Sequence, residues 1–468
     1  SIRPSARDVV QLSLYSGRDK LNIEYPFVDE SEGIQVDYQD ESQWGNLGSS
    51  LRWARKWNQR WFTNAIGSYS TYSSFLNARD RTTDLNFGIK DSTLTDRSGD
   101  LAELSLKFES ELSFLKHTVG LGVWSTYQEV HYTSKSSDGD KASLFESAAT
   151  LALYIQDEIN IRPNLSANVG ARLSYYDGNK QTFLEPRIAG EWQLHERFSL
   201  KVGIGRYTQA IRRIRRQNLF LNTPDFWRLS NGANIPVLVS DQWQIGFQIP
   251  SNKWIIDVEY YERYLNGVVA DPLQYSFEVR DQLSDLWTGT GQIRGVDIML
   301  QRTVGRHTGW ISATISKAVE QYNEVKQEEV YTPSDQRLEL NTVYLVRFPH
   351  WTITATGVFG SGRPTTPLIG YYNLELLNGS TTTVPVRGAI NSARLPAYHR
   401  LDLAARYNFV LGSGQAEFGV SIFNVYDRKN VRETQYYLSQ NSDASLVVDE
   451  KQLYYLGIMP AISFTITY

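Results

Sequence analysis

The stretch Leu395–Tyr426, LPAYHRLDLAARYNFVLGSGQAEFGVSIFNVY, decides the fold of this chain. Apolar side chains alternate with polar or small ones on both sides of a short link, Leu411–Gly414. Because successive side chains of an extended chain leave it on opposite faces, this period of two predicts two β-strands. The Gly- and Ser-containing link predicts an antiparallel hairpin. One face is apolar and the other polar, as expected of a sheet between an oily and an aqueous medium.

The same alternation recurs from the N-terminus to the C-terminal run that ends on Tyr468, and it is clear again in Leu165–Tyr175. We expect about 18 strands of roughly 10 to 15 residues, near the length that a tilted strand needs to cross a bilayer. The chain has no run of about 18 apolar residues, so the sequence excludes a helical membrane span.

Short and long connections alternate between these strands, a rule that outer-membrane barrels follow and soluble sandwiches have no reason to follow. The short connections are about 57–60, 161–164, 194–197, 250–253, 304–306, 348–350 and 411–414. The expected long loops are about 17–45, 74–99, 133–143, 211–238, 266–287, 362–395 and 428–452.

Aromatic side chains lie where the predicted strands meet the connections. An amphipathic ring suits the headgroup level of a membrane, so these residues predict two aromatic girdles. The alternative is aromatic packing across the strands of a soluble sheet. The residues are Trp53, Trp57, Trp61, Trp192, Trp243, Trp254, Trp310, Trp351, Tyr371 and Tyr372.

The composition excludes several other classes of function. A formal net charge of −4 does not indicate nucleic-acid binding, for which a basic domain is expected. The absence of cysteine excludes disulfides and thiolate metal sites. None of the six histidines has the spacing of a helix-borne zinc site. An acidic segment near Asp29–Glu41 has oxygen ligands for calcium but matches no known calcium loop, so we interpret it as a solvated loop. The sequence also lacks a Gly-x-Ser-x-Gly elbow and a phosphate loop, so we predict no enzyme, no metal and no cofactor.

Several segments, in this order along the chain, resemble the strands of TonB-dependent outer-membrane transporters. They are LEPRIAGEWQL (184–194), FSLKVGIGRYTQ (198–209), GQIRGVDIMLQR (291–302), DQRLELNTVYLV (335–346), RLPAYHRLDLAARYNF (394–409) and AEFGVSIFNVYDRKNV (416–431). The resemblance implies an all-β transmembrane antiparallel barrel of the Gram-negative outer membrane. Barrels of this family have roughly 22 strands around an N-terminal plug.

We therefore expect residues 1–468 to form one barrel domain of about 18 strands, part of a barrel of roughly 22. The plug and the first strands are expected elsewhere, on a separate chain or upstream of Ser1. The rival interpretation is a passive, substrate-specific porin of about 18 strands.

The resemblance also implies function. The barrel would serve TonB-dependent active uptake of a scarce nutrient: an iron–siderophore, cobalamin, an oligosaccharide or a peptide. The implied partners are the plug, TonB through the N-terminal region, and outer-membrane lipid and lipopolysaccharide. A surface lipoprotein is a further candidate partner.

Charged residues in the strands are predicted to face the lumen, because each would cost about 2–4 kcal/mol on the lipid face at mid-depth. They would either contact substrate or line a hydrated wall and pair with a plug or with neighbours; we favour the wall. The residues are Glu185, Arg187, Glu191, Asp257, Glu259, Arg263, Arg294, Asp297, Arg337, Glu339, Asp402, Arg406 and Glu417.

The candidate ligand-binding residues lie in the long loops. Arg212, Arg213, Arg215 and Arg216 form the densest basic run, suited to carboxylate or phosphate, although lipopolysaccharide or a plug would also satisfy it. Tyr371, Tyr372 and Trp287 are candidates for stacking on a ligand, and they share the loops with Phe226, Trp227, Tyr436 and Tyr437. The alternative is that these rings pack within the loops.

Overall fold

The structure is a computed structural model that describes residues 1–29, 34–84, 88–137, 141–215, 225–272, 285–375, 377, 381–440 and 446–467. Within these ranges, the structure contains no helix with the length and apolar character that crossing a membrane requires.

Twenty strands form one antiparallel sheet in the described ranges, and β1 and β17 are the short ones, so eighteen long strands remain. The long strands are β2 Asp8–Asp29, β3 Ile34–Lys56, β4 Trp61–Asp84, β5 Gly88–Phe114, β6 His117–Ser136, β7 Lys141–Arg162, β8 Leu165–Tyr176, β9 Gln181–His195, β10 Phe198–Gln209, β13 Leu238–Pro250, β14 Trp254–Ala270, β15 Trp287–Arg302, β16 His307–Tyr322, β18 Leu338–Arg347, β19 Trp351–Gly360, β24 Tyr398–Leu411, β25 Gly414–Phe423 and β28 Met459–Thr467.

The remaining strands are short or belong to two-stranded sheets outside the large one. They are β1 Ile2–Ser5, β11 Ile211–Ile214, β12 Phe226–Leu229, β17 Val330–Tyr331, β20 Pro364–Thr365, β21 Leu368–Glu375, β22 Thr381–Arg387, β23 Ala393–Arg394, β26 Val431–Gln440 and β27 Leu446–Tyr454.

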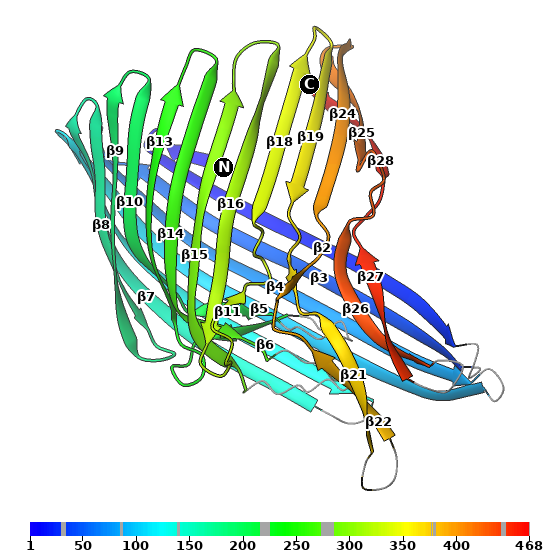
Figure 1. The fold of residues 1–468 in the computed structure, drawn as a ribbon. Helices are drawn as coiled ribbons and strands as arrows, with labels where there is room; N and C mark the ends of the chain where they lie inside the picture. Colours follow the sequence, from blue (N-terminus) through cyan, green and yellow to red (C-terminus); the bar gives the residue numbers. More distant parts are fainter. Residues whose placement is uncertain are drawn as a thin grey trace.

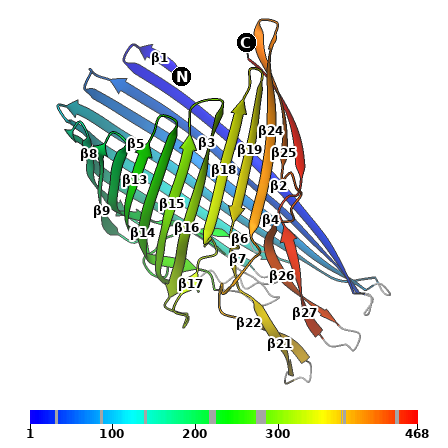
Figure 2. The same cartoon turned by 45° about the horizontal axis from the view of Figure 1, so that its top comes forward.

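The large sheet curls so that β2 to β7 pass behind β13 to β16 (Figures 1 and 2). The short turns and both termini lie at one end, and the hairpins β21–β22 and β26–β27 lie at the other (Figure 1). The all-β antiparallel fold and the predicted strand number are therefore confirmed. We call the two ends the short-turn end and the loop end.

The hairpin predicted from Leu395–Tyr426 is confirmed as β24 and β25. The two strands pair from Leu403 opposite Ile422 down to Leu411 opposite Gly414. Gly412 has a φ of 61°, which is the left-handed conformation that a tight hairpin turn requires and that glycine adopts without strain.

The predicted loops 17–45 and 74–99 are wrong, because most of both segments is strand. The strands β2 to β7 are 20 to 27 residues long, and the β2–β3 ladder continues to Asp29 opposite Ile34. Backbone hydrogen bonds pair these extensions residue by residue beyond the lipid-facing part of the sheet, where contact with lipid no longer restricts residue type.

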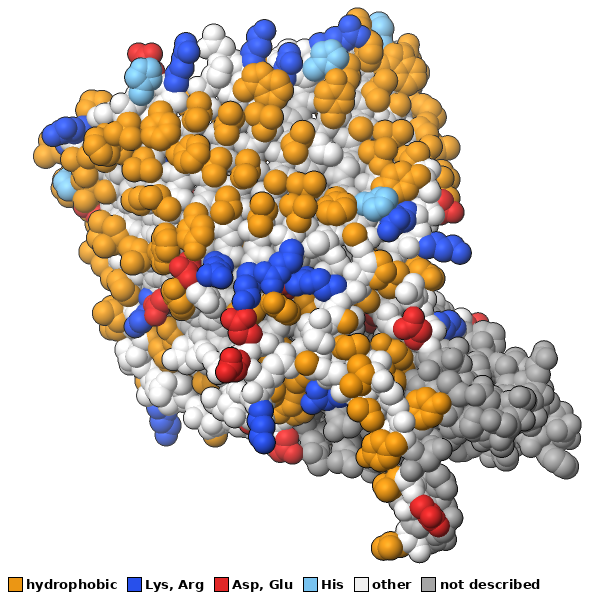
Figure 3. Space-filling view, viewed as in Figure 1, with side chains coloured by type: hydrophobic (Ala, Val, Ile, Leu, Met, Phe, Trp, Pro, Cys, Tyr) orange, Lys and Arg blue, Asp and Glu red, His pale blue; other side chains and the backbone are white. Residues whose placement is uncertain are grey.

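One face of the sheet is apolar and points away from the lumen, as predicted. Figure 3 shows a broad band of hydrophobic side chains, in orange, across this face of the sheet. Ile298 on β15 and Ile315 on β16 are 39% and 56% exposed. Their neighbours of opposite parity face inward; Asp297, for example, accepts a hydrogen bond from Thr314. An apolar surface of this extent marks a membrane-facing wall.

The aromatic girdle at the short-turn end is present. Trp61, Trp192, Trp254 and Trp351 are all exposed close to short turns. Trp310 departs from the prediction, because its parity on β16 is opposite to that of the exposed Ile311 and Ile315. Tyr371 and Tyr372 also depart, because they lie on β21, in a hairpin that projects beyond the sheet (Figures 1 and 2).

The lumen wall pairs its charges with neighbours, which fits the interpretation as a wall. The Glu185 carboxylate is buried and accepts hydrogen bonds from Ser174, Arg187 and Thr208. Lys201 on β10 reaches Asp257 on β14 at 2.9 Å.

Two predicted lumen residues lie elsewhere. Arg294 shares its parity on β15 with Ile298 and therefore faces outward. The Arg337 guanidinium stacks on Tyr331, which is opposite outward-facing Val319 in the β16–β17 ladder. Both residues lie at the loop end, beyond the apolar band, where an outward charge lies outside the hydrocarbon region and is not penalised.

The sheet has two free edges in the part of the chain that the structure describes. There, β28 pairs with β25 alone, and β2 pairs with β3 and, at its start, with the short β1. No ladder joins β28 to β2 among the described residues. In a bilayer, unpaired backbone groups along such edges would cost several kcal/mol each, so both edges require partners.

A hairpin inside the lumen contributes to two of the buried apolar clusters among the described residues. The strands β11 and β12 pair from Ile211 opposite Leu229 to Ile214 opposite Phe226, and β12 packs on β5, β6 and β7. Phe226 is fully buried, and its ring lies 5.3 Å from that of Tyr132. Arg228 forms an ion pair with Glu146 on β7 at 2.9 Å, with both side chains largely buried.

The direction of the apolar face can be tested at Ile298, midway between Arg294 and Arg302 on β15. Ile298→Arg should destabilise the membrane-inserted barrel by about 2–4 kcal/mol, because the new charge meets lipid at mid-depth. Urea unfolding in lipid vesicles measures the change. Met299→Arg is the matched control, since its side chain faces the lumen; equal destabilisation by both would contradict the assignment.

The Arg228–Glu146 pair anchors the lumenal hairpin. Arg228→Met leaves the Glu146 carboxylate buried without its cation, so the hairpin should be destabilised by about 3–5 kcal/mol. Hydrogen exchange of residues 211–214 and 226–229 should increase, while the ladder of β24 and β25 stays protected. Unchanged exchange in the hairpin would show that apolar packing alone holds it.

Candidate functional site

The β11–β12 hairpin divides the loop-end half of the lumen into two cavities. The front cavity, of about 270 Å³, lies between the hairpin and the ends of β14, β15 and β16. The rear cavity, of about 550 Å³, lies between the hairpin and β2 to β6. Arg213 lines both cavities, so a ligand in either one would meet its guanidinium.

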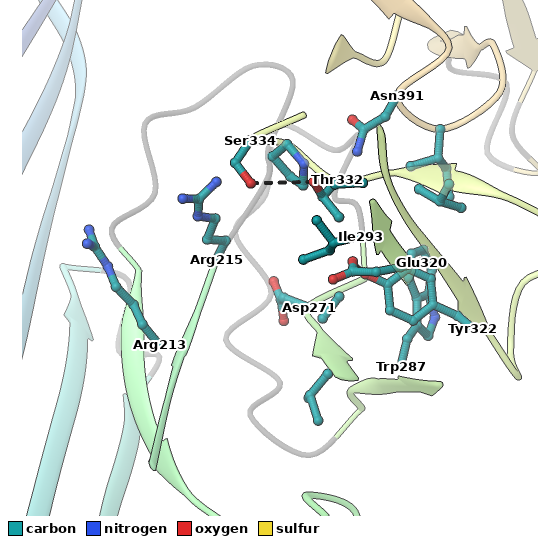
Figure 4. A pocket seen from close by; sticks show the side chains of 16 residues that line it. Arg213, Arg215, Asp271, Trp287, Ile293, Glu320, Tyr322, Thr332, Ser334 and Asn391 are labelled. Atoms are coloured by element: carbon teal, nitrogen blue, oxygen red, sulfur yellow. Dashed lines mark hydrogen bonds between the residues drawn. The ribbon is translucent and has the colours of Figure 1, made fainter. Parts of the chain in front are cut away.

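Figure 4 shows the front cavity, with cations on one side and rings on the other. Arg213 and Arg215 come from β11 and the residue after it, and Trp287, Glu320 and Tyr322 come from the ends of β15 and β16 (Figure 4). Asp271 and Ile293 lie between the two groups (Figure 4). Thr332, Ser334 and Asn391 complete the lining, and the hydroxyls of Thr332 and Ser334 are 3.4 Å apart.

The strands position these side chains through their alternation. Ile293 is opposite Ala318 in the β15–β16 ladder, and Glu320 and Tyr322 continue the same inward face to the end of β16. The ring of Trp287 is 5.8 Å from that of Tyr322, and the Tyr322 hydroxyl donates to Glu320. The result is a polar group beside two rings, an arrangement that binds an aromatic ligand through its edge and its face.

The arginine run does not act as one group. The Arg213 side chain is 60% exposed and forms an ion pair with Asp225 at 2.9 Å, while Arg215 is exposed towards the front cavity. Arg212 has the opposite parity on β11, and its guanidinium donates to the carbonyls of Pro236 and Gly267. Arg216 lies outside the described residues.

Arg212 is held by the fold. Burial lowers the pKa of its guanidinium to about 10, against the opposing effect of the Glu320 carboxylate. Arg212 stays charged at neutral pH, and one of its terminal nitrogens donates to both backbone carbonyls, so it links the hairpin to the segments of Pro236 and Gly267. Arg213 and Arg215 remain as the predicted cationic contacts that face a cavity.

Of the predicted aromatic contacts, too, only some line a cavity. Trp287 lines the front cavity, whereas Tyr371 and Tyr372 are exposed on β21 and line neither cavity. Tyr436 packs against the core cluster around Val268 and accepts a hydrogen bond from the Leu368 amide at 3.4 Å. The Tyr437 side chain lies outside the part that the structure describes.

Some cavity residues were missed from the sequence. Glu320 and Tyr322 could have been found, because the inward parity of Thr314 continues to them along one strand. Thr332 and Asn391 come from irregular segments that are joined by a hydrogen bond from the Asn391 side-chain amide to the Tyr331 carbonyl. No sequence periodicity predicts that these two segments lie side by side. Among the described residues, no group of three or more His, Asp or Glu side chains is placed to hold a metal ion.

The chain has matches among known families and solved structures. Residues 5–425 match the family model "TonB dependent receptor-like, beta-barrel". The structure is similar to BauA, the ferric preacinetobactin receptor from Acinetobacter baumannii, with a TM-score of 0.57 and 12% identity over 97% of this chain and 72% of that one.

Two further solved structures have the same fold. The FrpB iron transporter from Neisseria meningitidis gives a TM-score of 0.52 and 9% identity over 99% of this chain and 81% of that one. A mutant of the ferric enterobactin receptor PfeA from Pseudomonas aeruginosa gives 0.52 and 14% over 92% and 76%. No curated protein matches the chain in sequence. The family match covers most of the chain, and the chain therefore belongs to the β-barrel family of the TonB-dependent receptors.

Proposed function

We propose that this barrel takes up an anionic metal chelate of the siderophore class, which it binds first in the front cavity. The proposal rests on one observation: Arg213 and Arg215 line one side of the front cavity, and Trp287 and Tyr322 line the other side (Figure 4). An anionic chelate with aromatic metal-binding groups offers charge to the guanidiniums and flat faces to the rings. The ferric chelates named for BauA and PfeA support this class of ligand.

The position of the cavity suits capture from outside the cell. It lies at the loop end, which the short-turn rule assigns to the cell exterior. The anchored hairpin keeps Arg213 in place before any ligand arrives, and a preorganised contact loses little entropy on binding.

Uptake by this family implies a plug and TonB, and we propose that both act on this barrel. The plug would lie against the paired charges of the lumen wall. The free edges of β2 and β28 support the proposal that further strands complete the barrel, about four of them if it has the family's roughly 22. These strands would provide the backbone partners that both edges require in lipid.

Removal of the two cavity arginines should weaken binding of an anionic chelate. Each charge-assisted hydrogen bond contributes roughly 1.5–3 kcal/mol, so R213Q/R215Q should bind ferric enterobactin at least tenfold more weakly. Isothermal titration of the purified full-length receptor measures this change. A neutral ferric hydroxamate chelate should lose much less.

The matched control is Arg206→Gln, which removes a cation that pairs with Asp241 at 2.6 Å and lines neither cavity. Its affinity for ferric enterobactin should equal that of the wild type. If R213Q/R215Q binds ferric enterobactin with wild-type affinity, the proposed contact is wrong. If it loses as much affinity for the neutral chelate as for ferric enterobactin, the effect is structural.

Energy dependence separates the proposal from a passive porin. Uptake of the radiolabelled ferric chelate by cells should stop when the proton gradient is dissipated or TonB is deleted, because opening of the plug needs that energy. The control is uptake of a small sugar through the general porins of the same cells, which should continue. Chelate uptake that continues as well would favour the porin of about 18 strands.

A further inference from the structure

Four cations gather on the outward face of the sheet, directly beyond the apolar band. Figure 3 shows Lys and Arg side chains in blue below the orange band in the middle of the view. The register and ring contacts described below bring together Arg294, Lys317, Arg337 and Arg394, which we call the cationic patch.

The ladder of β15 and β16 fixes the direction of two of these side chains. Arg294 is opposite Lys317, and the pair shares its parity with exposed Ile298 and Ile315. Both cations therefore point to the same side as the apolar band, one step beyond its edge. A long cationic side chain in this position lays its aliphatic part on the apolar surface and places its charge at headgroup level.

A tyrosine holds the patch together. The Tyr331 ring centroid lies 5.9 Å from the Lys317 Nζ, 4.7 Å from the Arg337 guanidinium carbon and 5.3 Å from that of Arg394. Asp335 is fully buried beneath and pairs with both arginines. Because one carboxylate and one ring fix two guanidiniums, their remaining N–H groups have set directions.

The carboxylates near the patch do not occupy all of its donors. Lys317 pairs with Glu329 at 2.5 Å, and Glu262 is opposite Arg294 across β14 and β15. Glu262 already accepts hydrogen bonds from Tyr264 and Gln292. The Arg294 side chain is exposed, and within the described ranges it makes no hydrogen bond or ion pair.

We infer that the cationic patch binds the phosphate groups of a phosphorylated lipid headgroup in the leaflet at the loop end. A phosphate has three acceptor oxygens. They suit the fixed guanidiniums of Arg337 and Arg394, the exposed guanidinium of Arg294 and the ammonium of Lys317. The acyl chains of such a lipid would continue along the apolar band past Ile298 and Ile315. This inference does not depend on what the front cavity binds.

The test uses the purified full-length receptor in mixed micelles, with bis-phosphorylated lipid A as the probe. Because each Lys or Arg near an anionic lipid surface strengthens binding, R294Q/K317Q should bind the probe about 5- to 30-fold more weakly. The control R302Q/R306Q removes two cations at the other end of the same β15–β16 hairpin and should bind as wild type does. Native mass spectrometry measures bound lipid, and far-UV circular dichroism checks that each variant is folded.

Two further probes separate the sources of phosphate. Lipid A without its phosphates should bind the wild type and R294Q/K317Q equally weakly. If inorganic phosphate displaces lipid A at equimolar concentration, the site belongs to free phosphate and the inference fails. Equal binding of lipid A by R294Q/K317Q and R302Q/R306Q also overturns it. Should the double variant not fold, R294Q alone, at an exposed side chain, decides between the same outcomes.

Discussion

The structure depends on one constraint: a chain that crosses lipid must pair every backbone N–H and C=O while it shows lipid an apolar face. Antiparallel strands meet the first demand through their ladders, and alternation meets the second. The ladder of β15 and β16 satisfies both, with Ile298 outward and Asp297 inward at successive positions. The unpaired outer edges of β2 and β28 fail the first demand, and for that reason they are the places where this sheet needs more protein.

This constraint explains how much of the fold the sequence predicts. Within the apolar band, parity alone places a side chain, so the β24–β25 hairpin and the strand number could be predicted correctly. Beyond the band, water replaces lipid and parity no longer restricts residue type. The strands β2 to β7 continue there although we predicted loops in much of that part of the sequence, and Arg294 faces outward although charges in the strands were expected inside.

The candidate site was predicted in part, for a related reason. The arginine run and Trp287 stood out as charge and ring in long loops, and Arg213, Arg215 and Trp287 do line one cavity. The separation of Arg212 from Arg213 follows from their opposite parity on β11. That strand pairs with β12, and β12 packs on β5 to β7. Such packing joins residues more than 80 positions apart, as in Arg228 and Glu146, and a single sequence holds no record of those distances.

The hairpin also changes what the lumen can do. A barrel wall whose charges pair with each other, as Glu185 does with its three donors, presents few free groups to a passing ligand. A hairpin that enters the lumen adds the cations Arg213 and Arg215 to it, and its burial of Phe226 and Ile214 stabilises it there. Under the proposed function, ligand specificity depends on an apolar core formed inside the lumen. Changes to that core are then expected to alter uptake without touching either the ligand or the lipid-facing wall.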